Sequence, residues 1–176
     1  MTVLGLLTVM IVSGCVQNIS SDADPCSFAL KESDLPSHYV LVDSGQQEYD
    51  YIKDCSVVYR SLETGTVLMN DILVYNQTTV ETMKATGDDV GAEDNFDIIR
   101  RAVDQYVYTA IPIAEKIGTD SILIKHQNAA GEHIYDLSSY RGNVLFGVHL
   151  RSNSTDSPDF SPEKVVQYAL IVESRI

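Results

Sequence analysis

The segment 144–151, VLFGVHLR, decides the fold that we predict for this chain of 176 residues. Apolar side chains recur at every second position, which is the period of a β-strand that turns one face to a core. Val144, Phe146, Val148 and Leu150 make up that face, and they alternate with Leu145, Gly147, His149 and Arg151. We therefore expect a strand that lies in a sheet covered on one side.

Further strands are predicted on the N-terminal side of this segment. Residues 122–126 and 133–140 are β-rich, and the segments 128–131 (Asn-Ala-Ala-Gly) and 141–143 (Arg-Gly-Asn) supply the turns. Further upstream, the patterns predict a short strand at 38–42, a polar turn at 44–50, and a hairpin of 55–62 with 66–75. Turns this short favour antiparallel pairing.

Three helices interrupt or follow these strands. Thr78 and Glu81 have capping-box spacing and predict a helix over 79–86. Asp94 or Asn95 would cap a longer helix, and Ser161-Pro162 begins the last one. The longer helix has its apolar stripe at Phe96, Ile99, Val103 and Tyr106 or Val107, and the last one at Val165, Ala169, Val172 and Ile176. The expected fold class is α+β, a mainly antiparallel sheet with helices packed on it in one domain, residues 26–176.

The N-terminus has the pattern of an export signal. Residues 3–12 form an uncharged apolar run too short to span a bilayer, and Val12-Ser13-Gly14-Cys15 follows it. This motif resembles the lipobox of secreted lipoproteins. The resemblance implies a signal peptide at 1–14 and a lipid on Cys15. Residues 16–25 are polar with no apolar periodicity, so together with the lipid-bearing Cys15 they predict a flexible tether at 15–25. No Lys or Arg precedes Cys15, so either translation starts upstream or the signal tolerates an uncharged start; the alternative is a buried N-terminal element with an ordinary Cys.

If Cys15 carries lipid, two cysteines remain. Cys26 and Cys55 could form a disulfide in an oxidising compartment or stay as two free buried thiols. Asn-X-Ser/Thr sequons mark Asn18, Asn76 and Asn153 as glycosylation candidates, although chance can also explain them.

The formal net charge of −13 limits the classes of partner that the domain is expected to bind. An acidic domain repels nucleic acid and anionic headgroups, which excludes DNA or RNA binding and a polybasic membrane patch. Attachment to the cell membrane would therefore come from the lipid on Cys15, with the domain outside the cytoplasm. An envelope protein is the expected partner.

His126 and His133 are the candidate metal ligands. Placed opposite each other on paired strands, their Cβ atoms would be roughly 4.5 to 5.5 Å apart. A slip of one residue in register would separate them, and two half-exposed strand histidines are the alternative. No nucleophile elbow, Cys-x-x-Cys, phosphate loop or His-Glu-x-x-His motif occurs. We expect no cofactor and no enzymatic activity.

Short motifs along the chain also resemble a group of small envelope lipoproteins of unknown function, many of them archaeal. They are Asp34-Leu35-Pro36, Val74-Tyr75, the segment 117–121 and the segment 140–144. The resemblance implies a PsbP/Mog1-like α/β sandwich, and Gly-Thr-Asp-Ser stands here where the group often has Gly-Asp-Glu-Ser. The favoured function is a non-catalytic binding or assembly module at the cell surface. The alternative is a lipoprotein that binds a small molecule or metal near His126 and His133, and a hydrolase is least favoured.

Overall fold

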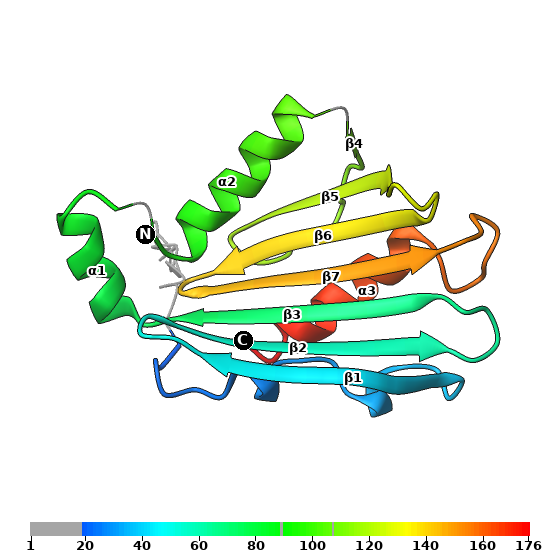
Figure 1. Cartoon of the computed structure of the whole chain (residues 1–176), viewed down its shortest axis with the longest axis horizontal. Coiled ribbons are helices and arrows are strands. Elements are labelled where there is room, and N and C mark those ends of the chain that lie inside the picture. Colours follow the sequence, from blue (N-terminus) through cyan, green and yellow to red (C-terminus); the bar gives the residue numbers. More distant parts are fainter. Residues whose placement is uncertain (1–18, 89, 107) are drawn as a thin grey trace, which may run out of the picture.

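A computed structural model describes residues 19–88, 90–106 and 108–176 (Figure 1). Its centre is a seven-stranded sheet in the order β1-β2-β3-β7-β6-β5-β4, with every neighbouring pair antiparallel. The strands are β1 Tyr39–Glu48, β2 Ile52–Ser61, β3 Val67–Tyr75, β4 Thr109–Ala110, β5 Asp120–Gln127, β6 His133–Arg141 and β7 Val144–Ser152. The helices are α1 Gln77–Ala85, α2 Ala92–Gln105 and α3 Pro162–Glu173, with short 3-10 turns η1 Pro25–Ser27 and η2 Glu32–Asp34. The predicted α+β class is confirmed.

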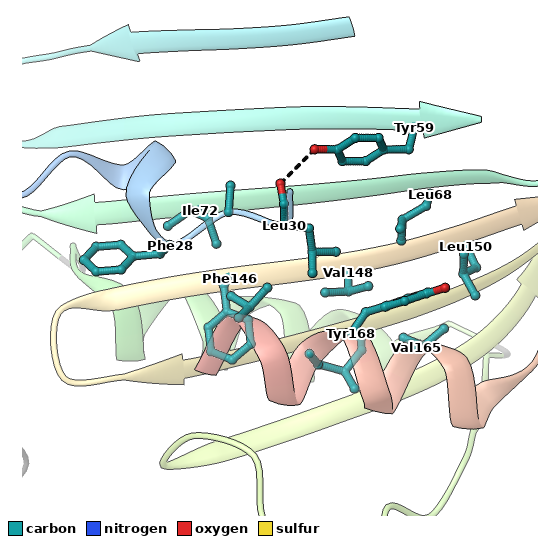
Figure 2. Close-up of a cluster of buried hydrophobic side chains, with 14 of the residues drawn as sticks. Phe28, Leu30, Tyr59, Leu68, Ile72, Phe146, Val148, Leu150, Val165 and Tyr168 are labelled. Carbon is teal, nitrogen blue, oxygen red and sulfur yellow. Dashed lines mark hydrogen bonds between the residues drawn. The ribbon is translucent and has the colours of Figure 1, made fainter. Parts of the chain in front are cut away.

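Helix α3 covers one face of the sheet and forms the main core with it (Figure 2). The alternation predicted for β7 is confirmed, because Val144, Phe146, Val148 and Leu150 are all buried on this side. From α3, Val165, Ala169 and Val172 are fully buried as predicted, and Ser161 caps the helix by accepting from the Lys164 amide. Each large side chain buried here contributes about 1.5–3 kcal/mol.

The N-terminal turns extend this core along β2 and β3. Figure 2 shows Phe28 and Leu30 beside Ile72, with the Tyr59 hydroxyl donating to the Leu30 carbonyl at 2.9 Å. The Asn70 side chain accepts from the Leu30 amide at 2.9 Å, which pairs a buried backbone donor. A disulfide joins Cys26 in η1 to Cys55 in β2, with the two Cα atoms 5.2 Å apart. Of the two states that the sequence left open, the structure has the bridge.

Among the described residues, helices cover the second face only at one end. Tyr75, Val80, Ala92, Phe96 and Leu145 form a smaller buried cluster where α1 and α2 meet the sheet. The predicted stripe of α2 is confirmed for Phe96 and Val103, which are buried. Tyr106 is exposed because the helix ends at Gln105, and Val107 lies outside the described residues.

Two predicted helix starts were wrong. Asn76, rather than the Thr78 and Glu81 box, caps α1 by accepting from the Thr79 amide at 3.2 Å. Helix α2 begins after Gly91, whose φ of 130° is a conformation that side chains disfavour, so neither Asp94 nor Asn95 is its cap.

The predicted turn at 44–50 was also wrong in its first part. Strand β1 continues to Glu48, paired with β2 apart from an irregularity at Val42, and its side chains from Leu41 to Glu48 are exposed. Residues 44–48 are polar because they lie on an edge strand, where their side chains face solvent. Polarity therefore reflects edge position here and not a turn.

Part of the predicted tether is held against the domain. The Asn143 side chain accepts from the Ile19 amide at 2.7 Å and donates to the Ile19 carbonyl at 3.0 Å. Ile19 and Ala23 also pack against the main core. Ordered contacts thus begin before Cys26. Cys15 and Asn18 lie outside the described residues, and no helix within those residues is long and apolar enough to cross a membrane.

Candidate functional site

The face of the sheet opposite α3 divides into two halves. Helices α1 and α2 pack on the end where β3 ends and β7 begins. Figure 1 shows no described helix in front of the other ends of β3, β7 and β6. We call this uncovered half the open face. It comprises Ser56 and Val58 of β2, Met69 and Asp71 of β3, Gly147 and His149 of β7, Asp136 and Ser138 of β6, and His126 of β5.

Four ionisable side chains form a continuous row across the open face. His149 Nδ1 lies 2.7 Å from Asp136 Oδ1, and His149 Nε2 lies 3.4 Å from Asp71 Oδ2. On the far side of the row, His126 Nε2 lies 2.5 Å from Asp136 Oδ2. Asp136 therefore holds two imidazoles, one with each oxygen. We call Asp71, His149, Asp136 and His126 the His–Asp row.

Strand register explains the row. Asp136 stands directly opposite His149, whereas Asp71 is paired with Gly147 and His126 with Ile134, each one diagonal step away. Direct and diagonal neighbours on one face of a sheet lie close enough for long side chains to touch. The four residues come from β3, β7, β6 and β5, so the row joins four strands.

Gly147 makes room for the His149 ring. A Cβ atom at position 147 would lie 2.6 Å from His149 Nε2, closer than such atoms approach in proteins. The imidazole thus lies across the bare backbone of Gly147 and reaches toward Asp71. A glycine in the middle of a strand has little packing value of its own, so this close approach accounts for it.

The row holds a half-buried positive charge between two negative ones. Burial alone would disfavour the imidazolium, but hydrogen bonds and charge from Asp136 and Asp71 outweigh it and raise the pKa of His149 to about 9. Burial also opposes the charged forms of Asp136 and Asp71, yet the His149 contacts lower the pKa of both carboxyls. At neutral pH, His149 is therefore a cation and both aspartates are anions.

The predicted pairing of His126 with His133 was wrong. His126 is paired with Ile134 and Gln127 with His133, so the two histidines project from opposite faces of the sheet. His133 lies on the α3 side, with its ring 6.5 Å from that of Phe160. The loop has one residue more than the pairing required, and this shift separates the pair. Within residues 19–88, 90–106 and 108–176, no group of three or more side chains is placed to hold a metal ion.

A second polar cluster surrounds Asp159 on the other side of the molecule. The buried carboxylate accepts from Ser61 Oγ at 2.9 Å, from Thr64 Oγ1 at 2.8 Å and from His38 Nε2 at 3.1 Å. Burial opposes its charge, but the hydrogen bonds from Thr64, Ser61 and His38 lower the pKa of Asp159. The serine is bonded to the carboxylate and not to the imidazole, so this is not a nucleophilic triad. The cluster ties the loop before α3 to the end of β2.

An apolar groove of about 400 Å³ lies between α3 and the segment that follows β4. Its apolar walls are Ile111, Pro112, Ile113, Leu123, Val166 and Leu170. The volume is within the range of small-molecule sites.

The two sequons within the described residues differ in their surroundings. Asn76 is half-buried, and its side chain is engaged as the cap of α1. Asn153 is exposed in the loop that follows β7. Only the second leaves its amide available to a modifying enzyme in the folded protein.

Comparison with known proteins gives a fold and no family. No model of a protein family matches the chain, and no curated protein matches it either. Among solved structures, it is similar to the extracellular domain of PknH from Mycobacterium tuberculosis, with a TM-score of 0.55 over 92% of this chain and 98% of that one. Sequence identity is 8%, so the likeness shows a shared fold alone.

Proposed function

We propose that this chain is a lipid-anchored module on the outer side of the cell membrane that binds a partner protein through its open face and performs no catalysis. It would then be one of the small envelope lipoproteins, many of them archaeal, whose motifs it resembles. The signal-like residues 1–14, the lipobox Cys15 and the Cys26–Cys55 disulfide support the location. The similarity to a domain named as extracellular agrees with it.

The His–Asp row is the observation that carries the binding role. Its charged groups are bonded to one another, so they are held in fixed positions on a face that no described helix covers. Apolar side chains border the row, with Met69 directly opposite His149 and Tyr108 edge-on to His126. Preorganised polar groups beside exposed apolar ones are typical of protein interfaces.

Site-specific photo-crosslinking in the producing cells tests the binding role. A photo-reactive amino acid replaces Met69 on the open face, and the control places it at Asp156, which is exposed in the loop that follows β7. We expect a discrete adduct from position 69 and none of that mass from position 156. Equal adducts from both positions, or none from position 69, would contradict binding through the open face.

Cell fractionation tests the anchor. The wild-type chain should pellet with membranes, and Cys15→Ser should move it to the soluble fraction. Membrane association that persists in Cys15→Ser would remove the lipid from the proposal, because a chain with a net charge of −13 is expected to be repelled by anionic headgroups without it.

Binding of a small apolar molecule is the second candidate, favoured by the groove beside α3. An environment-sensitive apolar dye should gain fluorescence with the wild-type protein. Val166→Trp, which fills the groove, should abolish the gain, while Lys164→Gln on an outer part of the same helix should keep it. Equal signals from the two variants would exclude the groove as the site.

A further inference from the structure

The N-terminal segment of the described chain is fastened to the domain at Ile19, the first described residue. Asn143 uses its amide oxygen and nitrogen to hold both backbone groups of Ile19, and its nitrogen also donates to the Tyr75 carbonyl at 2.7 Å. Asn143 is buried, with 2% of its surface exposed. A buried amide that satisfies three backbone groups is expensive to remove, so this contact is a firm attachment and not a passing one.

The attachment lies at one end of the sheet. Asn143 is in the turn between β6 and β7, beside the end of β3. From there β7 runs nine residues to Ser152, which corresponds to about 26 Å at the usual strand rise. The His–Asp row lies on the part of the sheet beyond the cover of α1 and α2 (Figure 1).

The reach of the chain from Cys15 is short. Four residue steps separate Cys15 from Ile19, and a fully extended chain covers at most about 14 Å over that length. A lipid on Cys15 would therefore hold the Asn143 turn close to the headgroups.

We propose that the Asn143 end of the domain faces the membrane surface, so that the His–Asp row lies on a side of the domain, farther along the strands from the bilayer. The inference rests on the proposed lipid on Cys15 and adds the orientation that the hydrogen bonds between Ile19 and Asn143 impose. The net charge of −13 disfavours poses that lay a broad face of the domain on anionic headgroups.

Fluorescence quenching in vesicles tests this orientation. The lipidated protein is incorporated into vesicles of phosphatidylcholine and phosphatidylglycerol that contain a nitroxide-headgroup lipid. A fluorophore is attached at one of two exposed positions at opposite ends of the sheet. The first is Arg141→Cys at the end of β6, beside the turn that holds Asn143, and the second is Ala129→Cys in the turn between β5 and β6. With Cys15 lipidated and Cys26 bridged to Cys55, the introduced thiol is the reactive one.

We expect loss of most of the fluorescence at position 141 and little loss at position 129. Equal quenching at the two positions in protein that floats with the vesicles would overturn the orientation while leaving the anchor in place. If the wild-type protein does not float with the vesicles, the anchor itself fails and the orientation falls with it.

A lengthened tether tests whether the short reach from Cys15 to Ile19 causes the quenching at position 141. A Gly-Ser insertion of about ten residues between Val16 and Gln17 keeps the lipid and the Asn143 contact but adds roughly 18 Å of average reach. Quenching at position 141 should fall while flotation persists. Unchanged quenching would show that the domain surface itself binds the membrane, which contradicts an orientation set by the short reach to Ile19.

Discussion

Asp136 Oδ1 lies 2.7 Å from His149 Nδ1, and the opposite side of the same carboxylate holds His126. This contact joins β6 to β7 at the centre of the sheet, on the face that α3 does not cover. The contact favours the cationic form of His149 and the anionic form of Asp136 at neutral pH.

His149 should titrate far above the ordinary range of histidine. Its imidazole signals, identified in NMR spectra by their loss in His149→Gln, should shift with an apparent pKa of about 9. In Asp136→Asn the pKa should fall, because one of the two stabilising carboxylates has gone. Titration of His149 near 6.5 in the wild-type protein would contradict the ion-paired row.

The stability that His149 contributes should depend on pH with a definite sign. A folded-state pKa raised from 6.5 to about 9 means that the contribution is complete below pH 6.5 and is lost as pH rises to 9. The full shift corresponds to about 3 kcal/mol. Urea unfolding of wild type and His149→Gln should show the largest difference at pH 6 and a much smaller one at pH 9.5. A difference that grows with pH would refute this linkage.

Gly147→Ala should destabilise the fold by about 1–3 kcal/mol, because the new Cβ would collide with the His149 ring. Gly45→Ala is the matched control. It also lies in a strand, but no atom lies within 4 Å of its added Cβ, so little change is expected. In a His149→Ala background the cost of Gly147→Ala should largely disappear. If Gly147→Ala lowers the free energy of unfolding by the same amount in that background, the imidazole of His149 is not the group with which the new Cβ collides.

Loss of the disulfide should cost about 3–4 kcal/mol, as expected for a loop closed over a separation of 29 residues. Cys26→Ser is the preferred variant, because Cys55 is almost fully buried and its replacement would add a packing defect. Denaturant unfolding should show the same loss in the wild-type protein after reduction. If reductant changes nothing, the two thiols are free.

The two described sequons should behave differently. Asn76→Ala should lower the free energy of unfolding by about 1 kcal/mol through loss of the α1 cap, whereas Asn153→Ala should have little effect. If the producing cell glycosylates asparagine, mass spectrometry should find the glycan at Asn153 and not at Asn76. A glycan on Asn76 would show that modification precedes folding of α1.

Alternation and turn chemistry were enough to predict most of the fold. Val144 to Leu150 mark a buried strand face, and Ser161-Pro162 marks the start of α3. The end of β1 was missed because an exposed edge strand has the polarity of a loop. Caps were missed where Asn76 and Gly91, instead of the residues with better motif spacing, precede the helices.

The His–Asp row was beyond sequence reasoning for a topological reason. His149 and Asp71 each occupy a polar position in an alternating strand, which is the signal that could have placed them on one face. Their contact, however, depends on β3 lying beside β7, and these strands are far apart in the chain. The His126 and His133 prediction failed on loop length, since one extra residue moves a side chain to the other face.

Partner binding through the open face should depend on Asp136, which holds both imidazoles of the row. The most direct measurement compares photo-crosslinking from position 69 in the wild-type chain and in Asp136→Asn, with the amounts of folded protein and of membrane-associated protein matched. We expect a discrete adduct in the wild type and its loss in Asp136→Asn, because His126 and His149 lose their shared anion. An adduct of equal yield in both chains would contradict partner binding through the row.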